Sequence, residues 1–353
     1  MNPPKKILII RLSSLGDIVL TTPVIKSLKQ KFPQSKTFFL TKSQYQDLLK
    51  NDPHIFSLIK FDPKEKHQGI SGFLKLIQEL KAFEFDLVVD LHANLRSFII
   101  RHLLKAKVKI KYDKRWLARL LLVHFKFIKV KPIHTVDSYL GALKKIGVNS
   151  SEKDPEIFSD QEGENFLKDF LIEKNIKKDD IAVGIHPGAR WETKRWNEEK
   201  FAQVCQILNQ KLKVKIILFG DQKDQEVIDR INPQAEDQKL FKAVNLPLNK
   251  FMSLIQRCDC FITNDSGPMH IASALGVPVV AIFGPTHPKL GFSPLGPENI
   301  VLTANVKCSP CSLHGEKKCH KKSRLCMDLI QPEMVADAVE KLLKKRFSLN
   351  KGT

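Results

Sequence analysis

Short runs of apolar residues alternate with longer amphipathic stretches along the whole chain. The first half contains KILIIRL, TFFL and DLVVDL, and the second half contains IAVGIHPG, KVKIILFG, CDCFITND and VPVVAIFG. Continuous apolar runs are typical of strands buried on both faces, and the stretches between them have the periodicity of covering helices. The pattern therefore predicts an α/β fold with parallel sheets.

A polar stretch at residues 149–165, NSSEKDPEIFSDQEGEN, interrupts this pattern before it restarts. At 353 residues the chain is also longer than one hydrophobic core usually organises. We predict two doubly wound, Rossmann-like domains, residues 1–160 and 161–330, facing a central crevice. A C-terminal helix and tail, residues 331–353, follow. Ligands of such sheets bind at the carboxyl ends of the strands, so the strand-end loops should hold the chemistry.

The composition narrows the classes of partner. The chain has 58 Lys and Arg against 38 Asp and Glu, a net charge of +20, which favours anionic partners such as nucleic acid, anionic lipid or a phosphorylated substrate. With three Trp, three Tyr and no recognisable nucleic-acid motif, we expect no nucleic-acid partner. The sequence has no secretion signal and no apolar run long enough for a membrane span, so we expect a cytoplasmic protein.

The first predicted strand ends in RLSSLGDIVLTTPVI. Ser13, Ser14 and Gly16 predict a tight turn, and Asp17 is expected at or just before a helix N-terminus. Helix capping by Asp17, worth about 1 kcal/mol, is the simplest interpretation of that carboxylate. The turn has neither the Gly-Lys-Ser/Thr ending of a Walker loop nor a full dinucleotide-binding fingerprint.

Cations follow a strand end in the second half, in GIHPGARWETKRW. The turn at Gly188 and Ala189 leads to Arg190, Lys194 and Arg195. Backbone N–H groups and cations in such a turn can surround a diphosphate. A solvated basic loop is the competing interpretation.

The segment FITNDSGPMHIASALGVPVVAIFGPT predicts a strand, a turn, a helix and a second strand. Ser266 and Gly267 should open the helix, so that free N–H groups and the positive end of its dipole could face a phosphate. Asp265 and His270 lie about one turn apart near that end. This mixture of residues is more specific than any one of them.

Together these segments resemble glycosyltransferase family 9, the ADP-heptose:lipopolysaccharide heptosyltransferases, over nearly the whole chain. The resemblance rests on SSLGDIVLTTPVI, HPGA…KRW, FG before a charged helix, NDSGPMHIASALGVPVVAIFGPT and the tail CSPC…C…CM, which is more similar to the type II enzymes. It implies a GT-B fold and an inverting transfer of heptose from ADP-heptose to the lipopolysaccharide inner core. It implies no cofactor for catalysis.

The resemblance also suggests residue roles. The catalytic base falls on Asp17, and the lysine that contacts the donor diphosphate falls on Lys194. Further donor-binding residues are Gly188, Ala189, Arg190, Asp265, Ser266, Gly267 and His270, with Asp224 preferred over Asp221 as the acidic residue at the ribose. The acceptor-side residues are Ser13, Ser14, Gly16, Arg96 and Ser97.

Two alternatives stay open from the sequence. Another GT-B nucleotide-sugar enzyme, specific for a different sugar or acting as a 2-epimerase, would have the same architecture, because fold does not fix function. A non-catalytic basic protein that binds RNA or anionic lipid would lose its ligand steeply as salt rises.

Residues 111–131, KYDKRWLARLLLVHFKFIKVK, mix apolar and basic side chains. The apolar residues are Trp116, Leu120, Phe125, Phe127 and Ile128, and the basic ones are Lys111, Lys114, Arg115, Arg119, Lys126, Lys129 and Lys131. Such a segment suits peripheral binding to the anionic inner face of the inner membrane, where each cation contributes about 1 kcal/mol. A core helix and strand with charged edges is the alternative.

The chain has seven cysteines, an odd number that favours reduced thiols or metal ligands over a disulfide framework. Cys308, Cys311, Cys319 and Cys326 are spaced C-x2-C, then seven residues, then six. The first pair has metal-knuckle spacing and the second does not, so a zinc ribbon fits poorly, although His314 or His320 could substitute. The alternatives are a structural zinc or iron ion and free thiols.

Overall fold

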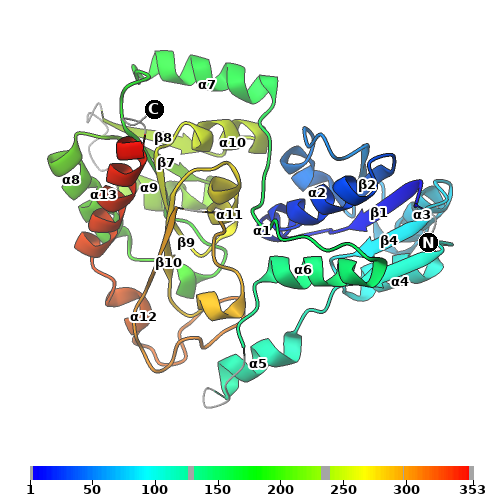
Figure 1. Ribbon diagram of the computed structural model, residues 1–353. Coiled ribbons are helices and arrows are strands. Elements are labelled where there is room, and N and C mark those ends of the chain that lie inside the picture. Colours follow the sequence, from blue (N-terminus) through cyan, green and yellow to red (C-terminus); the bar gives the residue numbers. More distant parts are fainter. Residues whose placement is uncertain (1–2, 126–130, 232–238, 297, 350–353) are drawn as a thin grey trace. The chain divides into compact units, whose positions relative to one another are not determined.

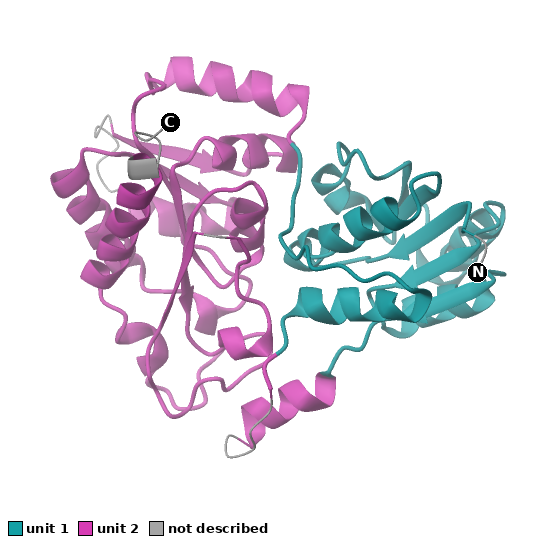
Figure 2. Cartoon of the chain, viewed as in Figure 1, with its two compact units in different colours: residues 1–115, 133–158 teal, residues 116–132, 159–353 magenta. Residues whose placement is uncertain are grey.

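The computed structural model describes residues 3–125, 131–231, 239–296 and 298–349 (Figure 1). The chain divides into two compact units, which Figure 2 shows in different colours. Unit 1 comprises residues 1–115 and 133–158, and unit 2 comprises residues 116–132 and 159–353. Of the predicted membrane segment, Lys126, Phe127, Ile128 and Lys129 lie outside the described residues.

Unit 1 is built on a five-stranded parallel sheet with the strand order β3-β2-β1-β4-β5. The strands are β1 (Lys6–Ile10), β2 (Lys36–Lys42), β3 (Ser57–Phe61), β4 (Leu87–Asp90) and β5 (Val108–Lys111). The helices are α1 (Leu15–Val19), α2 (Thr22–Lys31), α3 (Gly69–Lys81), α4 (Leu95–Leu103) and α6 (Thr135–Leu143), with 3₁₀ helices η1 (Ser43–Leu48) and η2 (Lys144–Ile146). The central strands are the apolar runs that the sequence pattern predicts.

Unit 2 contains a six-stranded parallel sheet with the order β11-β10-β9-β6-β7-β8. The strands are β6 (Ala182–His186), β7 (Lys215–Gly220), β8 (Leu240–Val244), β9 (Cys260–Asn264), β10 (Val279–Phe283) and β11 (Asn299–Thr303). The helices are α5 (Trp116–His124), α7 (Gln161–Glu173), α8 (Glu198–Leu212), α9 (Gln225–Ile231), α10 (Leu248–Gln256), α11 (Gly267–Ala274), α12 (Leu325–Asp328) and α13 (Pro332–Leu349). Short 3₁₀ helices are η3 (Glu192–Lys194), η4 (Gln222–Asp224) and η5 (Pro288–Leu290).

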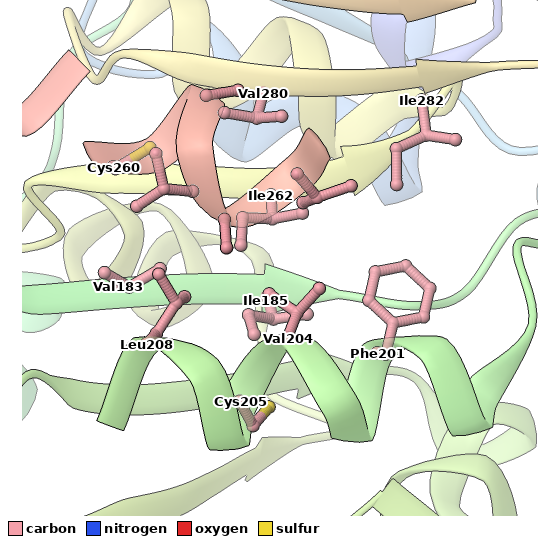
Figure 3. Packing of buried hydrophobic residues seen from close by; sticks show 14 of the residues in the cluster. Val183, Ile185, Phe201, Val204, Cys205, Leu208, Cys260, Ile262, Val280 and Ile282 are labelled. Carbon is pink, nitrogen blue, oxygen red and sulfur yellow. The ribbon is translucent and has the colours of Figure 1, made fainter. Parts of the chain in front are cut away.

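The core of unit 2 shows why these segments fold as they do. Phe201, Val204 and Leu208 recur at helical spacing on α8 and belong to one buried cluster with residues of β6, β9 and β10 (Figure 3). Helix α13 adds a second buried stripe to the same cluster. Apolar area removed from water, worth about 25 cal/mol per Å², holds these layers together.

The structure divides one predicted helix. The stretch between β1 and β2, where the sequence pattern predicts a covering helix, forms two helices, α1 and α2. Pro23 lies in the first turn of α2, where a missing N–H and a fixed φ suit a helix start.

In the described part of the chain, no helix combines the length and hydropathy needed to cross a bilayer.

Both sheets reverse their strand order at one point, between β1 and β4 in unit 1 and between β6 and β9 in unit 2. Ligands of doubly wound sheets bind at this switch point, outside the carboxyl ends of the strands. The loops after β1, β4, β6 and β9 lie at these switch points, and they include most of the predicted site residues.

Candidate functional site: two strand-end clusters

The unit 1 cluster is centred on an ion pair between Arg11 and Asp17. Arg11 follows β1, and its Nη2 lies 2.7 Å from Oδ2 of Asp17. Its Nη1 donates to the Leu91 carbonyl, 2.6 Å away at the end of β4, so one guanidinium joins both strands of the switch point. The same Asp17 oxygen accepts hydrogen bonds from the backbone N–H of Ser14 at 3.2 Å and from its hydroxyl at 2.6 Å.

These contacts correct the expected position of Asp17. Ser14 is the N-cap of α1, and Asp17 is the third helical residue, which completes a capping box with Ser14. Asp17 therefore lies inside the first turn rather than at or before the helix start. The capping role does not bury the carboxylate, because the Asp17 side chain stays 21% exposed.

Arg11 was not singled out in the sequence, and burial makes it the fixed partner of this pair. Its side chain is 8% exposed, against 21% for Asp17. Burial opposes the charge of Arg11, but Asp17 and nearby tyrosines outweigh it and raise the pKa of the guanidinium above its ordinary value. The cation therefore stays charged and holds the partly exposed carboxylate of Asp17 in one orientation.

His92 lies beside this pair and was also missed by the sequence interpretation. It follows β4, and its backbone N–H donates to Oδ1 of the buried Asp90 at 3.0 Å. Burial, reinforced by the charge of Arg11, lowers the pKa of His92 to about 3, so the imidazole is neutral near pH 7. Within the described chain its Nδ1 is buried and has no hydrogen-bond partner. Its place two residues after Asp90 at the switch point was the available signal.

The predicted acceptor-side residues lie on the loops of unit 1. Ser14 is exposed, Ser13 is half-buried and Gly16 is buried. Arg96 is exposed at the start of α4. Ser97 is fully buried and shares a capping box with Asn94, in which its Oγ accepts from the Asn94 N–H at 3.0 Å. Acceptor binding by these residues stays a prediction.

The unit 2 cluster brings Lys194 and Asp265 together. Lys194, in η3, places its Nζ 2.7 Å from Oδ2 of Asp265, which follows β9. Thr286, after β10, donates its hydroxyl to the same oxygen at 2.6 Å. Thr286 was not singled out in the sequence, although it ends the FGPT turn. Lys194 is thus held beside a carboxylate that Thr286 also fixes.

Asn264 ties the two strand ends of this switch point together. Its Nδ2 donates to the Pro187 carbonyl at 2.7 Å, and its Oδ1 accepts from the Trp196 N–H at 3.1 Å. Because Asn264 is buried, these bonds fix the segment that carries Lys194 relative to β9.

A second ion pair lies beneath the turn at Gly188. Nη2 of Arg195 is 3.2 Å from Oδ1 of Asp224, and Nε of Arg195 donates to the Ala189 carbonyl at 2.9 Å. Asp224 is buried and lies so close to Gly188 that a Cβ there would collide with its carboxylate. Asp221, by contrast, is exposed and caps η4.

Helix α11 begins as predicted, with Ser266 as N-cap and Gly267 as its first residue. The N–H groups of a first helical turn favour an anion. His270 is buried in this helix. At the end of β6, burial lowers the pKa of His186, and the charge of Asp224 opposes that shift. Arg190 is exposed, with its guanidinium 5.4 Å from the ring centre of Trp191.

Cys308, Cys311, Cys319 and Cys326 line one small cavity of about 20 Å³ in the cysteine loop, residues 308–326. Burial, and then the neighbouring thiols of the other three, raise the pKa of Cys326 to about 11. His320 lines the cavity as well. Among the described residues, no three Cys, His, Asp or Glu side chains are already arranged as a metal site, and all seven cysteines are free of disulfides.

Comparison with known proteins gives a consistent result. The model of glycosyltransferase family 9 (heptosyltransferase) matches residues 73–322. The chain is 31% identical over 338 residues to lipooligosaccharide heptosyltransferase 2 of Campylobacter jejuni, covering 94% of this chain and 96% of that protein. A solved family 9 glycosyl transferase from Veillonella parvula is 27% identical with a TM-score of 0.82, covering 97% and 98% of the two chains. E. coli ADP-heptose LPS heptosyltransferase II has the same fold, at 21% identity and a TM-score of 0.74, covering 97% and 99%.

Proposed function

Because the chain belongs to glycosyltransferase family 9 and is a glycosyltransferase, we propose that it transfers heptose from ADP-heptose to the inner core of a lipopolysaccharide. The observation that carries the proposal is the pair of strand-end clusters. The partly exposed carboxylate of Asp17 lies at the switch point of unit 1, and the cations Lys194 and Arg195 lie at that of unit 2.

In the proposed reaction the acceptor hydroxyl displaces ADP from the anomeric carbon with inversion. Asp17 accepts the hydroxyl proton late in the step, as the new C–O bond forms and the bond to the diphosphate breaks. Arg11 holds Asp17 in the orientation that proton transfer needs. Arg96, Ser97, Ser13, Ser14 and Gly16 are the proposed acceptor contacts.

The departing ADP gains negative charge, which the unit 2 cluster is suited to stabilise. Lys194 is the proposed cation at the diphosphate, and the first turn of α11, at Ser266 and Gly267, adds N–H donors. Arg190, Gly188, Ala189 and His270 complete the proposed donor site, with Asp224 at the ribose. These groups oppose the leaving-group charge without a divalent cation.

A panel of sugar nucleotides tests the donor. The melting temperature of the protein should rise most with ADP-heptose, because a ligand that binds only the folded state stabilises it by mass action. GDP- and UDP-sugars serve as matched controls. A larger shift with a UDP-sugar would contradict the donor and favour the alternative of a GT-B enzyme for another sugar.

We also propose that the α5 segment binds the anionic face of the inner membrane. Trp116 and Leu117 are 59% and 63% exposed on α5, and Phe125 follows at 46%. Val123 is the one helical residue of α5 that is buried, so this helix contributes little to a core. Vesicles with anionic lipid should sediment the protein at low salt and release it at high salt. Failure to sediment would contradict this location, and Trp116→Glu/Leu117→Glu should weaken the binding.

The cysteine loop is the proposed site of a structural zinc or iron ion. Its cavity has room for one water-sized occupant, which needs roughly 10–15 Å³, and four thiolates can close a tetrahedral metal site. The thiols would have to move into coordinating geometry and lose their protons on binding. Metal analysis after purification without chelator should find about one equivalent, lost in Cys308→Ser/Cys311→Ser. Less than about a tenth of an equivalent would rule out a tightly held ion.

A further inference from the structure

The cysteine loop makes direct contact with the segment that carries Lys194. The backbone N–H of Thr193 donates to the Glu316 carbonyl at 3.1 Å, and its hydroxyl donates to the same oxygen at 2.9 Å. The Glu316 N–H in turn donates to the Thr193 hydroxyl at 2.8 Å. Thr193 is 6% exposed and lines the cysteine cavity. Residue 193 is thus bonded on both its backbone and its side chain to a loop far away in the sequence.

Gly315 presses on the Lys194 side chain itself. A Cβ at Gly315 would lie 2.7 Å from Cδ and 2.8 Å from Cγ of Lys194, and 2.8 Å from Cβ of Trp191. Gly315 also has φ +93°, a backbone conformation that residues other than glycine rarely adopt. The loop backbone therefore forms a wall along the aliphatic stem of the lysine.

The same loop fixes the other partners of this cluster. The N–H groups of Cys311 and Ser312 donate to the Pro285 carbonyl at 2.8 and 3.2 Å, and the Ser309 hydroxyl donates to the Gly284 carbonyl at 2.7 Å. This turn leads directly to Thr286, which holds Asp265. The Arg324 guanidinium donates a hydrogen bond to the carbonyl of Arg195, the residue that follows Lys194.

We propose that the cysteine loop is a brace that positions Lys194 for the donor diphosphate, with Thr193 as the positioning residue and Gly315 as the wall behind the lysine stem. Charge stabilisation depends on where a cation is held, because a preorganised group does not have to reorient as charge develops. The proposal rests on the proposed role of Lys194 and extends it to residues that do not touch the donor.

Thr193→Val tests the brace, because valine keeps the shape of threonine and loses the two hydrogen bonds of the hydroxyl. We expect about a tenfold weaker affinity for ADP, as for a loss near 1.4 kcal/mol, and a matching rise in the KM for ADP-heptose. Thr193→Ser keeps the hydroxyl and should restore parental values. Thr303→Val, at an exposed site on β11, is the matched control and should change neither.

A double-mutant cycle with Lys194→Ala separates positioning from general destabilisation. If Thr193 acts through Lys194, Thr193→Val should change ADP affinity by less than about twofold once the lysine is absent. Additive effects would overturn the brace. Gly315→Ala, which displaces the lysine stem, should reproduce the loss, and it keeps the test open if Thr193→Val folds poorly.

The two hypotheses fail differently. Parental affinity and turnover in Lys194→Ala would overturn the proposed donor role of the lysine. An impaired Lys194→Ala together with parental Thr193→Val and Gly315→Ala would overturn the brace alone.

Discussion

The two strand-end clusters use the same kind of ion pair with opposite polarity. In unit 1 the cation is the more buried member, with Arg11 8% and Asp17 21% exposed. In unit 2 the carboxylates are more buried, with Lys194 14% against Asp265 10%, and Arg195 25% against Asp224 6%. In each pair the more exposed member is therefore different, a carboxylate in unit 1 and a cation in unit 2. The two sheets have the same strand order around their switch points, but they differ in which member of the ion pair is more buried. That member is a cation in unit 1 and a carboxylate in unit 2.

Asp17→Asn should have the largest effect on turnover. The amide keeps the shape and still accepts hydrogen bonds from Arg11 and Ser14, but it cannot take the acceptor proton. We expect kcat to fall about 1,000-fold while ADP affinity stays within about twofold, and steady-state kinetics with calorimetry would measure both. Transfer within a few-fold of the parent would remove Asp17 from catalysis.

Lys194→Ala should lower kcat/KM about 100-fold, through both donor affinity and turnover, because diphosphate charge grows toward the transition state. Removing the cation also leaves Asp265 without its ion-pair partner, which adds repulsion toward the donor. Lys289→Ala, on η5, is a control of the same charge change. Unchanged kinetic constants would show that the cations of unit 2 do not serve the diphosphate.

Asp224→Asn and Asp221→Asn sharpen the comparison within unit 2. If Asp224 holds the ribose, its amide variant should bind ADP about tenfold more weakly, whereas Asp221→Asn should change affinity less than about twofold. Calorimetric titration with ADP measures both. If Asp221→Asn instead weakened ADP binding more than Asp224→Asn, the ribose contact would be the exposed Asp221.

His92 gives the smallest expected effect, on stability below neutral pH. Its pKa is about 3 in the folded protein and near the ordinary 6.5 when unfolded, so its contribution is fully present above pH 6.5. Between these pKa values the unfolded state binds a proton that the folded state does not. The folding equilibrium constant therefore falls about tenfold for each pH unit of acidification. The groups around it are Arg11, Lys114, Lys42 and Asp17.

His92→Gln should therefore flatten the loss of melting temperature between about pH 7 and pH 4, relative to the parent. His102→Gln, at an exposed site on α4, should leave that slope unchanged. Equal slopes for His92→Gln and the parent would contradict a buried neutral imidazole beside Arg11.

Local patterns in the sequence predict the central strands and several helix starts. Continuous apolar runs give β1, β2, β4, β6, β7, β9 and β10, because a strand buried on both faces tolerates little else. Asn197 and Ser266 mark the starts of α8 and α11 as N-caps. The edge strands were not predicted. Strand β5, VKIK, for example, alternates lysine with apolar residues and buries Ile110 alone.

The contacts that shape the site are not local, and they escaped prediction for that reason. In the sequence Arg11 is an ordinary charged residue after a strand. Only the folded structure shows that β4 brings the Leu91 carbonyl beside its guanidinium. Likewise nothing near Thr193 indicates its bonds to Glu316. The family resemblance pointed to Asp17 and Lys194, but the residues that hold them required the folded structure.

Product analysis tests the central account most directly. The purified protein would be incubated with ADP-heptose and a lipopolysaccharide core that lacks the heptose, and the acceptor mass and released ADP would be measured together. The account predicts an acceptor heavier by one heptose for each ADP released, with neither product formed by Asp17→Asn. An unchanged acceptor with an epimerised or intact sugar nucleotide would contradict transfer and favour an epimerase or a non-catalytic binding protein.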